Sequence, residues 1–107
     1  MPRMTGAALS VAANSVSANV VAGKLYEFLT RRSRVLLSAV GSAAGLKATL
    51  VLGGRIVVND EDISGANRFP TLPDDAVTEE IGTGRIILTF RNTTAGALTV
   101  NWALDVT

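Results

Sequence analysis

Residues 85–107 read RIILTFRNTTAGALTVNWALDVT, and this stretch decides the fold class. Apolar and polar side chains alternate over 86–90, with Ile87 as the exception, and again over 98–106. Successive side chains of a β-strand point to opposite faces, so each run predicts a strand with one apolar and one mostly polar face. The link Thr93–Gly96 contains glycine and fits either a hairpin or a corner between two sheets.

Runs of the same kind occur upstream and are separated by Gly, Asn, Asp and Pro. The segment 24–34 fits either a helical stripe or a strand, and the β-rich surroundings favour the strand. A second run over 34–40 is expected to form its own strand. A short strand is also predicted over 77–81, followed by a turn at Gly82–Gly84.

Residues 46–59 contain the pair Gly53-Gly54 and admit two interpretations. They could form one long strand bent at Gly54, or a hairpin, because both glycines tolerate the positive φ of a two-residue turn. The usual strand length of about 5–6 residues favours the hairpin. The complete chain then has about eight short strands, which predicts an all-β protein, an antiparallel β-sandwich built as a single jelly roll.

The 107 residues form one domain in this interpretation. Residues 1–22, rich in Ala, Ser and Val, are expected to form an N-terminal strand or an arm that docks on a neighbour, and 23–107 the β-sandwich. The apolar stretch near the start is interrupted by Thr5, Gly6 and Ser10, so no cleaved signal peptide is expected. No apolar run reaches the roughly 20 residues that span a bilayer, so no membrane insertion is expected.

The composition favours assembly over catalysis. Hydrophobic residues make up 48% of the chain and charged residues 18%, which predicts that some apolar surface faces a second copy in a homo-oligomer. Cysteine and histidine are absent, so there is no thiol nucleophile and no imidazole base. The net charge of +1 creates no general attraction for nucleic acid or an anionic membrane. We therefore expect that the protein is not an enzyme and that it binds no small-molecule substrate and no cofactor.

Carboxylates are the only plausible acid–base groups of this sequence. Two acidic groups, Asp60-Glu61-Asp62 and Asp74-Asp75, could in principle supply a catalytic pair or a calcium site. No glutamate stands at the twelfth position from Asp60, where an EF-hand loop requires one. Solvated loop charges are the favoured interpretation, and no catalytic or metal site is predicted.

The arginines at 31, 32 and 34 are the strongest basic feature of the sequence. The favoured interpretation is that they are exposed charges that blunt a strand edge. In a functional role they could contact phosphates or an acidic patch on a neighbour. The acidic groups supply such a patch, so pairing between subunits is favoured over contact with nucleic acid. The candidate subunit-interface residues are Arg31, Arg32, Arg34, Asp60, Glu61, Asp62, Arg68, Phe69, Leu72, Asp74 and Asp75.

A family resemblance points in the same direction. The segments Asn67–Pro70 and Pro73–Asp75, together with Arg91–Val100, look like small structural proteins in the virions of bacterial viruses. Such proteins are single β-sandwich or jelly-roll subunits that coat or decorate a capsid. The resemblance implies self-assembly and contact with other virion proteins, in particles assembled in the host cytoplasm, without a cofactor or catalytic residues.

The sequence thus predicts a non-enzymatic structural subunit of a larger shell, as a viral coat or decoration protein. The alternative is a carbohydrate- or cell-surface-binding β-sandwich module. Aromatic residues make up only 5% of the chain, and Trp102 is expected in the core, which leaves few groups for a sugar to stack on.

Overall fold

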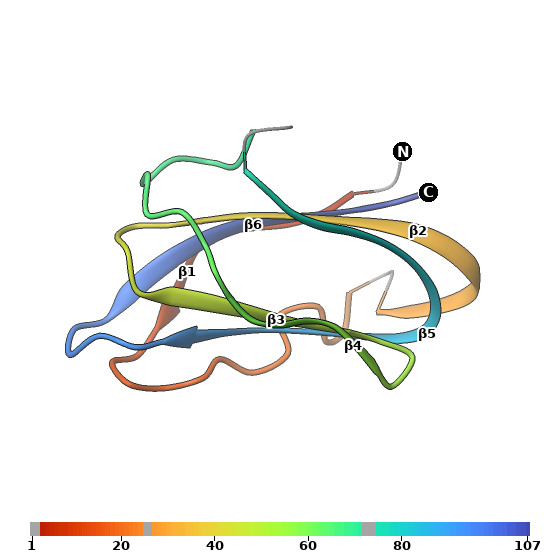
Figure 1. Ribbon diagram of the computed structural model, residues 1–107, viewed down its shortest axis with the longest axis horizontal. Coiled ribbons are helices and arrows are strands. Elements are labelled where there is room, and N and C mark those ends of the chain that lie inside the picture. Colours follow the sequence, from red (N-terminus) through yellow and green to blue (C-terminus); the bar gives the residue numbers. More distant parts are fainter. Residues whose placement is uncertain (1–2, 25–26, 72–74) are drawn as a thin grey trace.

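The structure is a computed structural model that describes residues 3–24, 27–71 and 75–107. Every regular element in these ranges is a β-strand, and neighbouring strands are antiparallel, so the predicted all-β antiparallel class is confirmed (Figure 1). No helix long and apolar enough to cross a membrane occurs in the part of the chain that the structure describes. The strands are β1 (Arg3–Val11), β2 (Phe28–Gly41), β3 (Leu46–Leu52), β4 (Arg55–Asp62), β5 (Ala76–Asn92) and β6 (Leu98–Val106).

The six strands form one sheet in the order β1-β6-β2-β5-β3-β4. Strand β5 holds the sheet together because residues 76–85 pair with β2 and residues 86–92 pair with β3. Between these two parts β5 curves sharply, and β2 curves beside it (Figure 1). The sheet therefore folds over, with β1, β6 and most of β2 facing β3, β4 and the second part of β5.

The prediction of about eight strands is wrong, since the described residues form six. The segment expected over 24–34 and the strand expected over 34–40 meet in one strand, β2, which begins at Phe28 and whose pairing with β5 shifts between Leu29 and Ser33. Residues 25 and 26 lie outside the described residues. The expected turn at Gly82–Gly84 lies inside β5. Glycine inside a strand commonly marks a kink, and here it marks the curve where β5 passes from one half of the sheet to the other.

The two ambiguous links have different outcomes. Gly53 and Gly54 have φ values of +57° and +84° and join β3 to β4, so the predicted hairpin is confirmed. The link Thr93–Gly96 is a corner, because it joins β5, which pairs with β2 and β3, to β6, which pairs with β1 and β2. The buried Asn92 side chain fixes this corner by donating to the carbonyl oxygens of Val11 and Gly96.

The N-terminal part of the chain lies along both halves of the sheet. Strand β1 is an edge strand paired with β6. Residues 12–22 then run along β5 on the side away from β3, with Ser17 N–H donating to the Phe90 carbonyl at 2.8 Å and Val20 N–H to the Leu88 carbonyl at 2.9 Å. These residues thus form the outer border of the half that contains β3 and β4.

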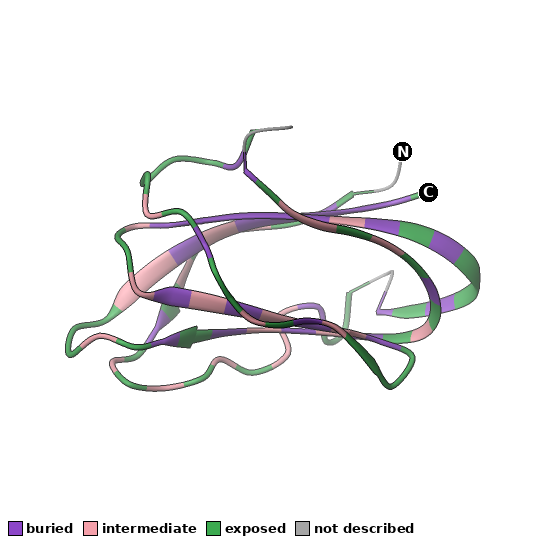
Figure 2. Ribbon diagram, in the orientation of Figure 1, coloured by how far each residue is buried: buried purple, intermediate pink, exposed green. Residues whose placement is uncertain are grey.

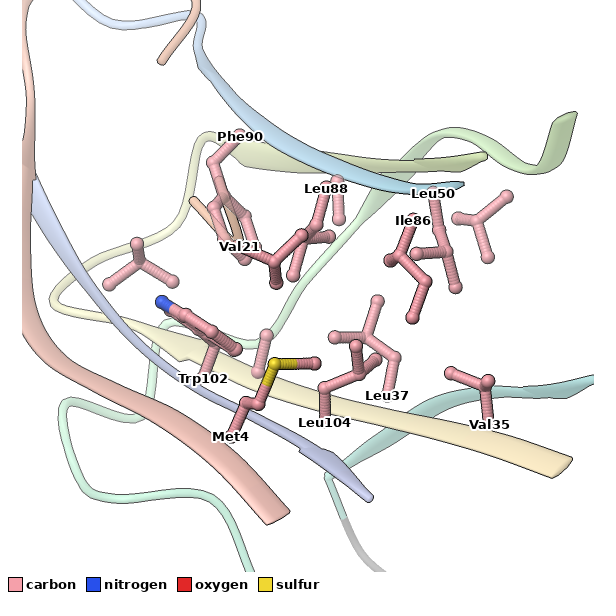
Figure 3. Packing of buried hydrophobic residues seen from close by; sticks show 14 of the residues in the cluster. Met4, Val21, Val35, Leu37, Leu50, Ile86, Leu88, Phe90, Trp102 and Leu104 are labelled. Carbon is pink, nitrogen blue, oxygen red and sulfur yellow. The ribbon is translucent and has the colours of Figure 1, made fainter. Parts of the chain in front are cut away.

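The core fills the space between the two facing halves (Figure 3). The run 86–90 buries Ile86, Leu88 and Phe90 completely, and 98–106 buries Val100, Trp102, Leu104 and Val106. Figure 2 shows buried residues alternating with less buried ones along β3 and the second part of β5, as expected for strands with one face on a core. The ends of β2 and β6 are buried without a break, over 37–41 and 102–106. The two runs that predicted the fold therefore supply its interior from opposite halves of the sheet.

Candidate functional site

The Asp60–Asp62 group lies at the end of β4, and two of its members pair with basic residues of neighbouring strands. The Arg91 Nε donates to Asp60 Oδ1 at 3.0 Å, and Lys47 Nζ lies 2.8 Å from Asp62 Oδ1. Glu61 is exposed and has no ion pair within the described residues. Strand pairing places Lys47 opposite Asp62 and so explains one of these contacts directly.

Asp75 is the most enclosed member of the acidic groups, with 7% of its surface exposed. Arg68 Nη2 donates to both carboxylate oxygens at 2.9 and 3.0 Å, and the Thr71 N–H donates to Oδ2 at 2.8 Å. These contacts tie the loop after β4 to the start of β5. Phe69, in the same loop, is 42% exposed, and the predicted interface residues Leu72 and Asp74 lie outside the described residues.

The arginines at 31, 32 and 34 lie where β2 curves, away from the acidic groups (Figure 1). All three are exposed. Arg34 Nε is 3.6 Å from Glu79 Oε1, a long contact, and Arg31 and Arg32 have no ion pair among residues 3–24, 27–71 and 75–107. Within one chain the structure does not bring these arginines to Asp60–Asp62 or Asp75, so their pairing across a subunit contact stays a prediction.

The curve also gathers residues that the sequence analysis missed. Arg55 follows the Gly53-Gly54 turn, and its Nη2 donates to the Ile81 carbonyl at 3.0 Å. A groove of about 390 Å³ results, which we call the bend groove. It is lined by Arg32, Arg34, Arg55, Glu79, Glu80 and Ile81. This groove could not be predicted from the sequence. Its arginines lie on β2 and β4, which come close together only when the strands pair in register.

Phe28 lies at the start of β2 and is 61% exposed. The Arg85 guanidinium, opposite it in the register, is 5.8 Å from the centre of its ring. Arg85 Nε also donates to Glu27 Oε2 at 3.0 Å. An aromatic ring is thus available to solvent on the same strand as Arg31 and Arg32.

The acidic end offers little for metal binding. Asp60, Asp62, Ser64 and Gly65 follow the spacing of the first half of an EF-hand loop, but Asp60 and Asp62 point to Arg91 and Lys47. A hollow of about 160 Å³ adjoins Glu61, Asp62 and Asp75. No group of three or more potential ligand side chains that could hold a metal ion occurs among the residues that the structure describes.

Hydrogen bonds lower the pKa values of several carboxylates in the folded protein, so its stability is expected to depend on pH in the acid range. The Thr71 N–H, followed by Arg68, lowers the pKa of Asp75 below its usual 3.8. The Gly23 N–H, followed by Arg85, lowers the pKa of Glu27 below 4.5, and Arg91 lowers the pKa of Asp60. In the folded chain these carboxylates therefore hold protons less tightly than in the unfolded chain.

The unfolded state then takes up protons first as the pH falls, so stability is complete above the usual pKa values and is lost below them. We expect the urea midpoint to be constant from pH 7 to about 5 and to fall steadily from about pH 4.5 to 3. Asp75→Asn should have a lower midpoint at pH 6 and a weaker loss on acidification. A wild-type midpoint that is equal at pH 6 and pH 3 would contradict the linkage.

Comparisons with protein-family models, with curated proteins and with solved structures found no match to this chain. The surface itself is therefore the basis for a proposal about function. This surface has three main features. One half of the sheet has exposed borders, the acidic residues pair with basic residues of the same chain, and the arginines where β2 curves have only long ion pairs or none among the described residues.

Proposed function

We propose that this protein is a non-enzymatic structural subunit that assembles with copies of itself into a larger shell, as a coat or decoration protein of a virion assembled in the host cytoplasm. In this proposal the folded-over sheet acts as a β-sandwich of the jelly-roll class, and other virion proteins are further partners. Exposed side chains on the borders of the sheet support the proposed assembly.

The observation that carries the proposal is a pair of exposed apolar side chains on opposite borders of the same half of the sheet. One border is the segment 12–22, where Val16 is 58% exposed. The other is β4, where Ile56 is 59% exposed. Neither side chain belongs to the buried cluster between the two halves of the sheet, so covering them requires another surface.

Two different borders on one subunit favour head-to-tail contacts. A contact between unlike surfaces repeats from subunit to subunit and yields a ring, a lattice or a filament. Unpaired strand edges supply backbone hydrogen bonds for such a contact, and the apolar side chains supply buried area. The end of β4 carries Asp60, Glu61 and Asp62, which discourage edge pairing, so the proposed contact uses the beginning of β4 around Ile56.

The border formed by β1 is less suited to this role. Its pairing with β6 is interrupted between Gly6 and Leu9, and Ala8 has a φ of +52°. Such a bulge twists an edge away from a potential partner. Burial of Trp102, which is 1% exposed, weighs against the alternative of a carbohydrate-binding module, because the indole is the best stacking surface for a sugar.

Light scattering after size-exclusion chromatography tests the assembly. We expect wild-type protein to form large, regular particles whose mass rises with concentration. Val16→Lys and Ile56→Lys should each prevent growth, because a lysine on a strand edge opposes pairing. Each variant keeps the border that the other lacks, so an equal mixture of the two is expected to form dimers that grow no further.

Thr5→Lys, on the exposed surface of β1, serves as the control and should assemble like the wild type. A wild-type protein that is monomeric at every concentration would overturn the proposal. Dimers of the Val16→Lys variant alone would show that β4 pairs with itself, and continued growth of that variant would show a contact elsewhere; either result contradicts the head-to-tail contact.

A further inference from the structure

Most arginines of this chain fall into two groups that differ in how their N–H donors are used. Arg85, which pairs with Glu27 and lies over the Phe28 ring, belongs to neither. Those of the first group lie away from the curve, and each forms a two-point contact with a carboxylate, in which several donors are occupied. These pairs are Arg3–Asp105, Arg68–Asp75 and Arg91–Asp60.

The arginines around the bend groove have long ion pairs or none among the described residues, and Arg55 also donates from its Nη2 to the Ile81 carbonyl at 3.0 Å. Arg34 lies 3.6 Å from Glu79, and Arg55 lies 3.9 Å from Glu80, which is too long for a good hydrogen bond. Arg32 lines the groove without an ion pair to any described residue. Most of their N–H donors are therefore free for an anion from outside the chain.

An exposed aromatic ring accompanies these donors. Phe28 is 61% exposed, and it precedes Arg32 by four residues on β2. Four residues of extended chain span at most about 14 Å. Arg31 lies between them and adjoins, with Phe28, a second hollow of about 180 Å³. Arg31 and the ring of Phe28 therefore adjoin one hollow, and the bend groove begins farther along the same strand.

We infer that the bend groove and Phe28 together bind single-stranded nucleic acid. Phosphates would occupy the guanidinium groups of Arg32, Arg34 and Arg55, displacing the two loosely held glutamates. An unpaired base would stack on Phe28. Single strands are recognised by this combination of a basic groove along the backbone and aromatic rings for the bases.

The acidic end of a second copy is a poorer partner for this surface. Asp60, Asp62 and Asp75 are engaged by Arg91, Lys47 and Arg68 of their own chain, and those contacts would have to break first. A phosphate backbone is free of such competition and presents a regular row of charges that a groove can follow. The inference does not rest on the proposed assembly, although Arg55 and Ile56 are neighbours at the start of β4. Variants at Phe28, Arg32 and Arg34 test binding without changing the borders at Val16 and Ile56.

Fluorescence anisotropy with a labelled 20-nucleotide oligo-dT tests the inference, at salt concentrations from 20 to 200 mM. We expect binding that weakens as salt rises. Arg32→Gln/Arg34→Gln should weaken binding about tenfold or more. It should also reduce the slope of log K against log salt by about 1.4, the value expected for the loss of two phosphate contacts to a single strand. Phe28→Ala should weaken binding at least about fivefold while leaving the slope unchanged.

Matched controls are available elsewhere on the chain. Lys47→Gln/Arg91→Gln also removes two positive charges, but beside Asp60 and Asp62. Phe69→Ala removes another exposed aromatic ring, which is 42% exposed. Both controls should bind like the wild type. Circular dichroism and urea unfolding of every variant separate lost binding from lost folding.

Absence of binding at 20 mM salt would overturn the inference, as would equal losses in the variants and their controls. Equal affinity for a labelled poly-glutamate peptide, with no effect of Phe28→Ala on either ligand, would assign the surface to acidic protein instead. Tighter binding to a duplex than to the single strand would also contradict the role given to Phe28.

Discussion

Trp102→Ala is expected to lower the free energy of unfolding by about 3–5 kcal/mol, the usual cost of removing a large aromatic side chain from a core. Trp102 is 1% exposed on β6 and lies in the cluster between the two halves of the sheet (Figure 3). Its ring is covered by Gly6 of β1, where an added Cβ would lie only 2.7 Å from Cε2 of the indole. The indole therefore holds the edge strand and the core together.

Urea unfolding followed by circular dichroism measures this effect. Phe69→Ala removes a large aromatic side chain that is 42% exposed, and it should change the stability far less. A loss of less than about 1 kcal/mol for Trp102→Ala would show that the neighbouring strands close over the vacated space, contrary to a rigidly packed core.

Gly84→Val is expected to cost about 2–5 kcal/mol, because two unfavourable effects add. Gly84 has a φ of +89°, which costs an L-residue about 1–2 kcal/mol, and more if it is β-branched. A Cβ there would also lie 2.9 Å from the Cα of Gly53, and overpacking typically costs about 1–3 kcal/mol. The tip of the β3–β4 hairpin would have to move away from β5.

Gly96→Val is the matched control for this substitution. No atom lies within 4 Å of a Cβ built at Gly96, and its φ lies outside the left-handed region. Its effect should therefore stay within about 0.5 kcal/mol, as for most surface changes. Similar stability of the two valine variants, measured by thermal unfolding, would contradict the close approach of Gly53 and Gly84.

The local pattern of the sequence was sufficient to predict the strand class. Alternation over 86–90 predicted the buried face of Ile86, Leu88 and Phe90, because the period of side chains in a strand is a property of the backbone. Gly53-Gly54 likewise predicted its turn, because the conformation of two residues determines a hairpin. Such features depend on neighbours in the sequence and can be read from it.

Features that depend on the register could not be read in this way. Gly82–Gly84 looked like a turn, and only the pairing of β5 with both β2 and β3 shows that the strand continues through it. Asp105 was expected on the polar face of β6, yet it is 3% exposed and pairs with Arg3, 102 residues away. The bend groove has the same origin, since Arg34 and Arg55 come together only through the register.

The pairing of β1 with β6 has a consequence for how this chain folds. Arg3 is opposite Asp105, so the sheet is complete only when residues about one hundred positions apart have met. Closing such long loops costs entropy before any contact repays it, and folding of β-rich domains with distant pairings takes about milliseconds to seconds. Until β6 is in place, β1 and β2 each lack the neighbour that lies between them in the sheet. Nascent chains are therefore most prone to aggregation during this interval, before the last strand has been synthesised and inserted.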